Sequence, residues 1–269
     1  MTTQTGFSNV DASTHGDELV DYLAMVAKTV AQLRQADYEQ LNLREGMAML
    51  DVGCGAGEVC VELATRVGAR GRMAGIDPSE IMIAAAQRAV AASGQVVDLQ
   101  VGSIYALPFP DATFDVVRAE RVFQHLDNPE AGLREMLRVT RKGGRVMVID
   151  PDHSQWGMGL DNAADRRVYA ASLRAMMQMI VNPCVGTALR GLFRQARLID
   201  VAQQVRSLEL AHPDYLRASF LQERLAAAVA AGEITVDEAQ KFMATLAARH
   251  AAGTFFCNAI GYSVVGTKA

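Results

Sequence analysis

The 269-residue sequence contains few cysteines and lacks any long apolar run. Its four cysteines form no Cys-x-x-Cys pair, which argues against a zinc knuckle or a thiol redox motif. No stretch of about 18 apolar residues occurs, so we expect no membrane insertion. Residues 1–13 also lack the apolar centre of a signal peptide. Scattered cysteines in apolar surroundings are typical of small core residues in a reducing compartment, so we expect a cytoplasmic protein.

The sequence also lacks an excess of basic residues. It has 26 Lys and Arg against 30 Asp and Glu, a net charge of −4, which argues against a broad nucleic-acid surface. Apolar residues make up 50% of the chain, enough to bury a core, so disorder is excluded as the main state. We therefore expect a folded protein whose partner is a small-molecule substrate and not nucleic acid. A homodimer is the one assembly that we consider.

Short apolar strands alternate with helical segments in the first 150 residues. Residues 1–16 show no periodicity and predict a flexible tail, while residues 17–269 predict a single domain that opens with a helix at 17–41. Strands are expected at 47–52, 72–76, 96–101, 114–118 and 145–149, separated by helices at 58–67, 79–93 and 129–142. This alternation predicts a doubly wound α/β fold with a mostly parallel sheet and helices on both faces.

The pattern changes after Pro151. Apolar spacing predicts helices at 155–182, 187–196, 213–231 and 235–250, and strands at 198–208 and 254–266. The last two helices interrupt two strands, as an insertion over the sheet would. Segments 155–180 and 213–250, approximately, therefore predict a mobile helical cover. Its Met-rich faces suit a bulky apolar or aromatic small molecule.

The strongest local motif is a strand that runs into a glycine-rich turn and then a helix. It reads Met49-Leu50-Asp51-Val52-Gly53-Cys54-Gly55-Ala56-Gly57. Glycines let backbone amides approach a ligand that a Cβ would keep away. Asp77 ends the next predicted strand, where a carboxylate can accept hydrogen bonds from two ribose hydroxyls.

This turn differs from phosphate-binding loops of similar appearance. A dinucleotide site would show Gly-x-Gly-x-x-Gly and a P-loop would show Gly-Lys-Ser/Thr, and neither is present here. Asp51, just before the turn, would repel a phosphate but suits an ammonium group. A ligand with a ribose, an amino group and no phosphate is S-adenosyl-L-methionine, which we predict as the cofactor.

Four motifs in the first 150 residues resemble those of class I S-adenosylmethionine-dependent methyltransferases. In chain order they are Leu50–Gly57, Gly75–Ser79, Leu107–Asp115 and Arg138–Gly144, and the last two are similar to the branch related to ubiquinone and menaquinone biosynthesis. The resemblance implies a Rossmann-like, seven-stranded sheet whose last strand, at 254–266, is antiparallel. It implies methyl transfer to a small molecule, and it is specific for fold and cofactor more than for substrate.

The resemblance also assigns cofactor contacts. Residues of the glycine-rich turn would hold the methionine end and the ribose face. The acid at the end of the second strand would take the ribose hydroxyls, with two neighbours packing on the adenine. Residues after the third strand would lie near the adenine, and those after the fourth would line the methionine amino group. The full set is Asp51, Gly53, Gly55, Gly57, Asp77, Pro78, Met82, Gly102, Ser103, Ile104, Ala119 and Glu120.

Two cofactor contacts cannot be assigned simply by matching this sequence to the family's usual motifs. The family usually has Gly-Asp-Ala after the third strand, where this chain has Gly102-Ser103-Ile104. Adenine binding would therefore depend more on the backbone. Tyr22 or Arg34 of the first helix could bind the methionine carboxylate.

Polar residues follow the fourth and fifth predicted strands, at the carboxyl edge where ligands bind in open α/β sheets. His125 is a candidate general base, because imidazole titrates near neutral pH. Arg121 could bind an acidic or phenolate substrate, or form an ion pair with Glu120 or Asp152. Asp152 and His153 could bind substrate or share a proton. We predict His125, Arg121 and Asp152 as the catalytic residues. We predict no metal, because no third carboxylate or amide ligand is evident.

Two other functions are compatible with the same cofactor motifs. One is a relative of the fold that binds S-adenosylmethionine but catalyses a rearrangement or a cyclisation. The other is a binding module that senses the cofactor without turnover. Release of S-adenosylhomocysteine in the presence of substrate separates the methyltransferase from both.

Overall fold

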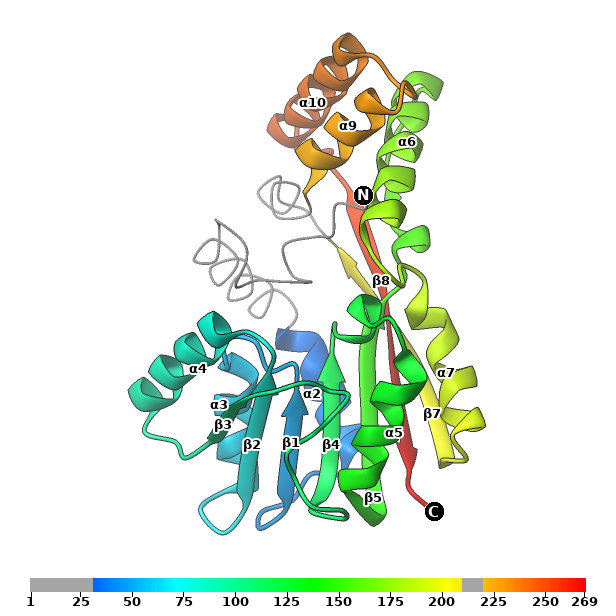
Figure 1. Ribbon diagram of the computed structural model, residues 1–269. Coiled ribbons are helices and arrows are strands. Elements are labelled where there is room, and N and C mark those ends of the chain that lie inside the picture. The colour runs from blue at the N-terminus through cyan, green and yellow to red at the C-terminus, as the bar shows by residue number, and fades with distance from the viewer. Residues whose placement is uncertain (1–30, 210–219) are drawn as a thin grey trace.

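The computed structural model describes residues 31–209 and 220–269, which form an eight-stranded sheet (Figure 1). The strand order is β3-β2-β1-β4-β5-β8-β6, and β7 pairs with β8. The strands β1 to β5 run parallel, whereas β8 runs antiparallel to its three partners. Their bounds are β1 (Ala48–Val52), β2 (Arg72–Asp77), β3 (Asp98–Val101), β4 (Phe114–Glu120), β5 (Thr140–Pro151), β6 (Gly157–Met158), β7 (Ile199–Glu209) and β8 (Cys257–Thr267).

Helices cover both faces of this sheet, as the sequence predicts. One face carries α2 (Ala31–Leu41), α3 (Glu58–Val67) and α4 (Glu80–Ser93), whose apolar side chains form one core with the sheet. The other carries α5 (Pro129–Val139) and α7 (Val185–Gln195), which pack into a second core. The Rossmann-like fold and its antiparallel last strand are confirmed. The eighth strand is the two-residue β6, which sequence patterning did not predict.

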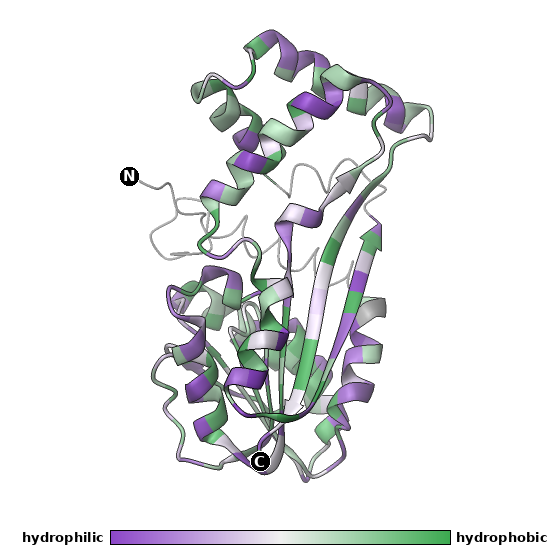
Figure 2. Ribbon diagram, turned by 90° about the vertical axis from the view of Figure 1, so that its right-hand side faces the viewer, coloured by the Kyte–Doolittle hydropathy of each residue, from purple (hydrophilic) through white to green (hydrophobic). Residues whose placement is uncertain are grey.

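A third group of helices has a core of its own. It consists of α6 (Ala163–Met179), α9 (Leu221–Ala230) and α10 (Val236–Ala251), packed around Leu225 and Phe242. Figure 1 shows this group beyond the carboxyl ends of the parallel strands, with the long strand β8 extending from the sheet toward it. Figure 2 shows hydrophilic and hydrophobic residues interspersed along these helices, as expected of amphipathic segments. The group therefore lies on the side of the sheet where ligands bind in this class of fold.

Two predicted helices are wrong in their extent. The helix expected at 129–142 ends at Val139, because Thr140 is extended and begins β5. The helix expected from 155 begins only at Ala163. The residues before it form the short helix η4 (His153–Gln155) and then β6, which pairs with β8. The predicted tail at 1–16 and the start of the first helix lie outside the described residues, as do residues 213–219 of the predicted helix at 213–231.

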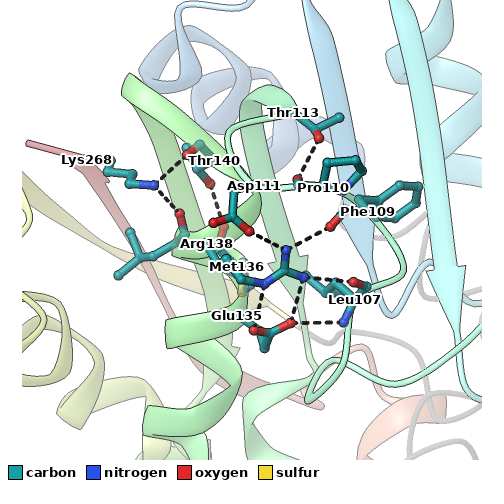
Figure 3. Close-up of polar contacts among 11 residues, drawn as sticks. Leu107, Phe109, Pro110, Asp111, Thr113, Glu135, Met136, Arg138, Thr140 and Lys268 are labelled. Carbon is teal, nitrogen blue, oxygen red and sulfur yellow. Dashed lines mark hydrogen bonds and ion pairs between the residues drawn. The ribbon is translucent and has the colours of Figure 1, made fainter.

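The two later family motifs contact each other, which Figure 3 shows. Arg138 on α5 donates to the carbonyls of Leu107 and Phe109 and to the carboxylates of Asp111 and Glu135, each over 2.8 or 2.9 Å. This network holds the loop between β3 and β4 against α5.

The end of α5 has a separate partner in the same view. Lys268 Nζ donates to the carbonyl oxygens of Leu137 and Thr140, both at 2.8 Å (Figure 3). These carbonyls lie at the carboxyl end of the helix, where intrahelical partners are missing. A residue just past the last strand therefore helps to end this helix.

Candidate cofactor and substrate site

The glycine-rich turn follows β1 and has a left-handed backbone at each of its three glycines. The φ angles are +72° at Gly53, +54° at Gly55 and +84° at Gly57. A Cβ at Gly53 would lie 2.3 Å from Val122 Cγ2, closer than side-chain atoms approach. Gly53 N and Cys54 N both donate to the carbonyl oxygen of Ile76. The turn therefore requires glycine and is fastened to the neighbouring strand.

Asp77, at the end of β2, connects the turn to the next helix. Its Oδ2 accepts from Gly55 N at 2.9 Å, and its Oδ1 accepts from Ser79 N at 3.0 Å. Ser79 Oγ in turn caps α4 by accepting from Met82 N at 3.1 Å. The carboxylate is thus held in a fixed orientation beside the glycine-rich turn, where the sequence predicted it.

The residues predicted near the adenine lie at different depths. Pro78 is exposed, whereas Met82 is buried against Ala56 of the turn and Ala85 of α4. After β3, Gly102 N donates to the carbonyl oxygen of Asp77.

The two residues that follow Gly102 also differ in their exposure to solvent. Ser103 is exposed and pairs with Ala106 in a short bridge. Ile104 is buried in the core, which leaves Ser103 as the more accessible polar residue of this segment.

A buried arginine that the sequence analysis did not single out joins two of the predicted acids. Arg118 on β4 is 1% exposed, and strand register places it beside Asp51. Its Nη1 lies 3.2 Å from Asp51 Oδ1, and its Nη2 lies 2.5 Å from Glu120 Oε2. Cys60 Sγ also donates to Asp51 Oδ2 at 3.7 Å. Asp51 is therefore already paired inside the protein, and the Glu120 side chain, 15% exposed, is the more open of the two carboxylates.

The charges of this trio are set by burial and by mutual pairing. Burial raises the pKa of Asp51, against the opposing effect of Arg118. Burial also acts to raise the pKa of Glu120, but the guanidinium groups of Arg118, Arg121 and Arg34 outweigh it and the pKa falls below its ordinary value. Arg34 Nε itself lies 3.5 Å from Glu62 Oε2. Asp51, Arg118 and Glu120 thus form a buried network in which one guanidinium pairs with both carboxylates.

The segment after β4 is bent sharply and held in place. Arg121 has φ +58°, and its N donates to the carbonyl oxygen of Ile149 at 2.7 Å. The next turn is η3 (Phe123–His125), whose first two backbone amides donate to the Asp150 carboxylate at 3.0 and 3.2 Å. Burial raises the pKa of Asp150 to about 7. Asp150 therefore positions the loop that carries Arg121 and His125, a role that sequence patterning missed.

His125 ends η3 and is half-buried. Burial, with a smaller effect from the Arg121 guanidinium, lowers its pKa to about 4. The imidazole is therefore neutral near pH 7 and can accept a proton. This satisfies one requirement for a general base, although the low pKa makes it a weak one.

Asp152 is 1% exposed and its carboxylate already accepts several hydrogen bonds. Its Oδ1 accepts from Ser154 N at 3.0 Å and from Ser154 Oγ at 2.5 Å, and its Oδ2 accepts from Thr187 Oγ1 at 2.8 Å. It thereby caps η4 and connects it to α7. The arrangement favours a positioning role for Asp152 over direct contact with substrate.

Within residues 31–209 and 220–269, no group of three His, Cys, Asp or Glu side chains is placed to hold a metal ion. Over the same ranges, no helix is both long enough and apolar enough to cross a membrane.

The fold and this site together define a class. A doubly wound sheet with a glycine-rich turn and an acid after the second strand, both at its carboxyl edge, is the arrangement of nucleoside-cofactor-binding Rossmann-like proteins. Comparison with known proteins identifies the family within this class. The family model described as "Methyltransferase domain" matches residues 43–204, more than half of the chain. The chain belongs to this family, the S-adenosylmethionine-dependent methyltransferases.

Individual relatives agree with this membership. The chain is 32% identical to an uncharacterized 37.1 kDa protein in transposon TN4556 of Streptomyces fradiae, over 91% of this chain and 70% of that protein. It is 34% identical to the demethylmenaquinone methyltransferase of Desulfitobacterium hafniense, over 44% of this chain and 47% of that protein. The match thus spans about half the length of that curated relative.

A solved structure shares the fold. Phosphoethanolamine N-methyltransferase 2 of Haemonchus contortus, in complex with S-adenosyl-L-methionine, superposes with a TM-score of 0.58 at 14% identity. The superposition covers 100% of this chain and 60% of the Haemonchus contortus chain.

Proposed function

We propose that this protein transfers a methyl group from S-adenosylmethionine to a small apolar or aromatic metabolite. The observation that carries the proposal is the glycine-rich turn, fastened to β2 through Ile76 and to the Asp77 carboxylate. A Cβ at Gly57 would meet Ala86 Cβ at 2.7 Å, so the end of the turn packs closely against α4 and Asp77 lies beside it. The residues present therefore fit a nucleoside cofactor laid across the ends of β1 and β2.

The cofactor contacts follow from this placement. Asp77 would accept hydrogen bonds from the ribose hydroxyls, with Pro78, Met82 and the segment from Gly102 to Ile104 beside the adenine. Ala119 and Glu120, at the end of β4, would face the methionine amino group. Asp51 would act indirectly, through its ion pair with Arg118, which also pairs with Glu120.

The chemistry requires little from the protein beyond alignment. When bound, S-adenosylmethionine supplies a methyl group on a sulfonium, and transfer is an in-line displacement that depends on orientation and on exclusion of water. His125 would accept the proton of a hydroxyl or acidic carbon. Arg121 would stabilise negative charge that develops on the acceptor. Asp152 would position η4, and through it this edge of the site.

The helical group of α6, α9 and α10 would cover the substrate. Trp156 and Met158, which precede α6, pack against the core of this group, and Met176 on α6 is buried. Methionine and aromatic side chains adapt to ligands of varied shape, which suits an apolar or ring-bearing acceptor. The net charge of −4 favours a small molecule over nucleic acid as the partner. A cytoplasmic location and a homodimer stay predictions.

Calorimetry with S-adenosylmethionine tests the cofactor site. Asp77→Ala should weaken binding by roughly 1–3 kcal/mol, because hydrogen bonds to a charged group are lost. Asp98→Asn is the matched control, since its carboxylate pairs with Arg72 at the other end of the sheet and its loss should leave affinity unchanged. Equal affinity in Asp77→Ala and in the unmodified protein would remove Asp77 from the site. Release of S-adenosylhomocysteine with an acceptor would exclude a binding module and a cyclase.

A further inference from the structure

His153 lies where the chain leaves β5, at the carboxyl edge of the sheet, and its position is fixed by several contacts. It is 7% exposed, and its backbone N donates to the carbonyl oxygen of Pro183 at 2.9 Å. Its ring centroid is 5.1 Å from that of Trp156. The imidazole is thus a buried polar ring held rigidly beside the proposed substrate region.

A chain of hydrogen bonds determines which nitrogen of this ring carries the proton. Gln124 Nε2 donates to the carbonyl oxygen of Arg121 at 3.2 Å, and a carbonyl can only accept. The other end of the amide, Gln124 Oε1, therefore faces His153 Nε2 at 2.8 Å and must accept from it. His153 is held as the tautomer with hydrogen on Nε2, which leaves a lone pair on Nδ1.

The charged groups around the ring keep it in that neutral form. Burial and the Arg224 guanidinium of α9 lower the pKa of His153 to about 3, with smaller effects from His125 and Arg121 and an opposing one from Asp152. These groups come from the loop after β4, the loop after β5 and the helical group. His153 therefore lies where the sheet edge and the helical group meet.

Nδ1 is the unusual atom of the ring. It is buried, and it makes no hydrogen bond within the described part of the chain. Buried acceptors in folded proteins nearly always find a donor, and leaving one without a partner destabilises the protein. A ligand that supplies a hydrogen at this position would recover that free energy.

We propose that His153 Nδ1 accepts a hydrogen bond from an O–H or N–H group on the substrate. The acceptor molecule is then a hydroxyl- or amine-bearing ring compound and not a plain hydrocarbon. This inference rests on the proposed function, because it places the substrate at the carboxyl edge of the sheet. It assigns His153 as a substrate-binding residue and gives the substrate one required group.

Phenol and its methyl ether, anisole, test this directly. They share a ring, but only phenol can donate a hydrogen bond. Trp156 is the single tryptophan of the chain, so its fluorescence reports binding beside His153. In the full-length protein saturated with S-adenosylhomocysteine, phenol should quench this fluorescence saturably. It should bind about fivefold to tenfold more tightly than anisole, the effect of one hydrogen bond.

Two substitutions separate this role from a structural one. His153→Gln can keep the hydrogen bond to Gln124 but loses the acceptor at Nδ1, so the preference for phenol should disappear while the melting temperature stays close to that of the unmodified protein. His153→Asn places an amide oxygen near Nδ1 and should retain much of the preference, at lower stability. Nitrogen-detected NMR of labelled histidine should show Nε2 protonated and Nδ1 bare.

Several results would overturn the inference. These are absence of quenching by phenol, equal binding of phenol and anisole, an unchanged preference in His153→Gln, or a proton on Nδ1. Failure of the proposed function looks different, because calorimetry would then show no binding of S-adenosylhomocysteine to the unmodified protein. If the unmodified protein binds S-adenosylhomocysteine normally but shows no preference for phenol over anisole, only the role of His153 is contradicted.

Discussion

At the scale of single residues, the site depends on charges that are paired before any ligand binds. Asp51 was expected to face a cofactor ammonium group, yet its carboxylate is 5% exposed and pairs with Arg118. The pair forms because β1 and β4 lie side by side in parallel register, with Asp51 opposite Arg118. Glu120 shares the same guanidinium and reaches closer to the surface. Asp51 therefore influences the site indirectly, through the ion pairs that Arg118 makes with both Asp51 and Glu120.

We expect Arg118→Met to destabilise the protein strongly, because it leaves two carboxylates buried without their partner. Breaking a buried ion pair from one side typically costs about 3–5 kcal/mol. Arg141→Met is the matched control, since Arg141 is half exposed and pairs with Asp115 at the surface, where such pairs contribute roughly 0–1 kcal/mol. Urea denaturation would compare the two. Similar losses in both variants would contradict the buried network.

The pKa of His125 gives a pH-dependent prediction. A protonated imidazole cannot accept a proton, so turnover of the unmodified protein should fall as the pH drops through about 4. His125→Gln should keep cofactor affinity but lower turnover by about 10²–10⁴-fold, the usual effect of losing a positioned base. The loss should be smallest at high pH, where the substrate ionises unaided. A variant as fast as the unmodified enzyme at every pH would show that alignment alone suffices.

Stability must be followed in the same experiments. The folded-state pKa of His125 lies below its ordinary value of 6.5, so the unfolded chain binds the proton more readily. The contribution of His125 to stability is therefore lost as the pH falls from about 6.5 toward 4. Melting temperatures recorded at each pH separate this effect from catalysis.

At the scale of elements, the sequence predicted most strands and helices, but it misplaced two boundaries. The helix α5 was expected to continue through Arg141 and Lys142, which are good helix formers. It stops at Val139 because Thr140 joins β5 and Lys268 binds the terminal carbonyls from the far end of the chain. No local pattern encodes such a partner. The glycine-rich turn and Asp77 were predictable because their chemistry requires particular residues at adjacent positions.

Gly57 provides a test of the turn. Gly57→Ala would place a Cβ 2.7 Å from Ala86 Cβ, at φ +84°, between α3 and α4. Gly143→Ala imposes a similar left-handed backbone, at φ +74°, with nothing within 4 Å. Backbone strain should lower the free energy of unfolding of both variants by about 1 kcal/mol. Overpacking should lower that of Gly57→Ala by about 1–3 kcal/mol more. Urea unfolding measures the difference between the two variants. Equal losses of stability would show that α3 and α4 can move apart to accommodate the added methyl group at little cost.

At the scale of the whole molecule, the helical group is the part whose function the fold alone does not settle. α6, α9 and α10 have a core separate from the two cores that flank the sheet. They also lie beyond the carboxyl ends of the parallel strands (Figure 1). Strong periodicity made these helices predictable, whereas their position over the sheet depends on β8, which joins both regions.

Hydrogen exchange tests whether this group covers the substrate. We expect α6, α9 and α10 to gain protection when cofactor and an acceptor bind together, because a cover closes over its ligands. The amides of β1 and β4 should be protected in every state and provide the internal reference. Full protection of α6, α9 and α10 without ligands would mean that they are fixed structure.

The central claim is methyl transfer to a small molecule, and one measurement addresses it directly. S-adenosylmethionine labelled in its methyl group is incubated with the full-length protein and a metabolite extract, and products are separated by size. We predict that label appears in a small molecule in the same amount as S-adenosylhomocysteine is released, and that Asp77→Ala strongly reduces both. Cofactor that binds but keeps its label, or label that appears in protein or nucleic acid, would contradict the account.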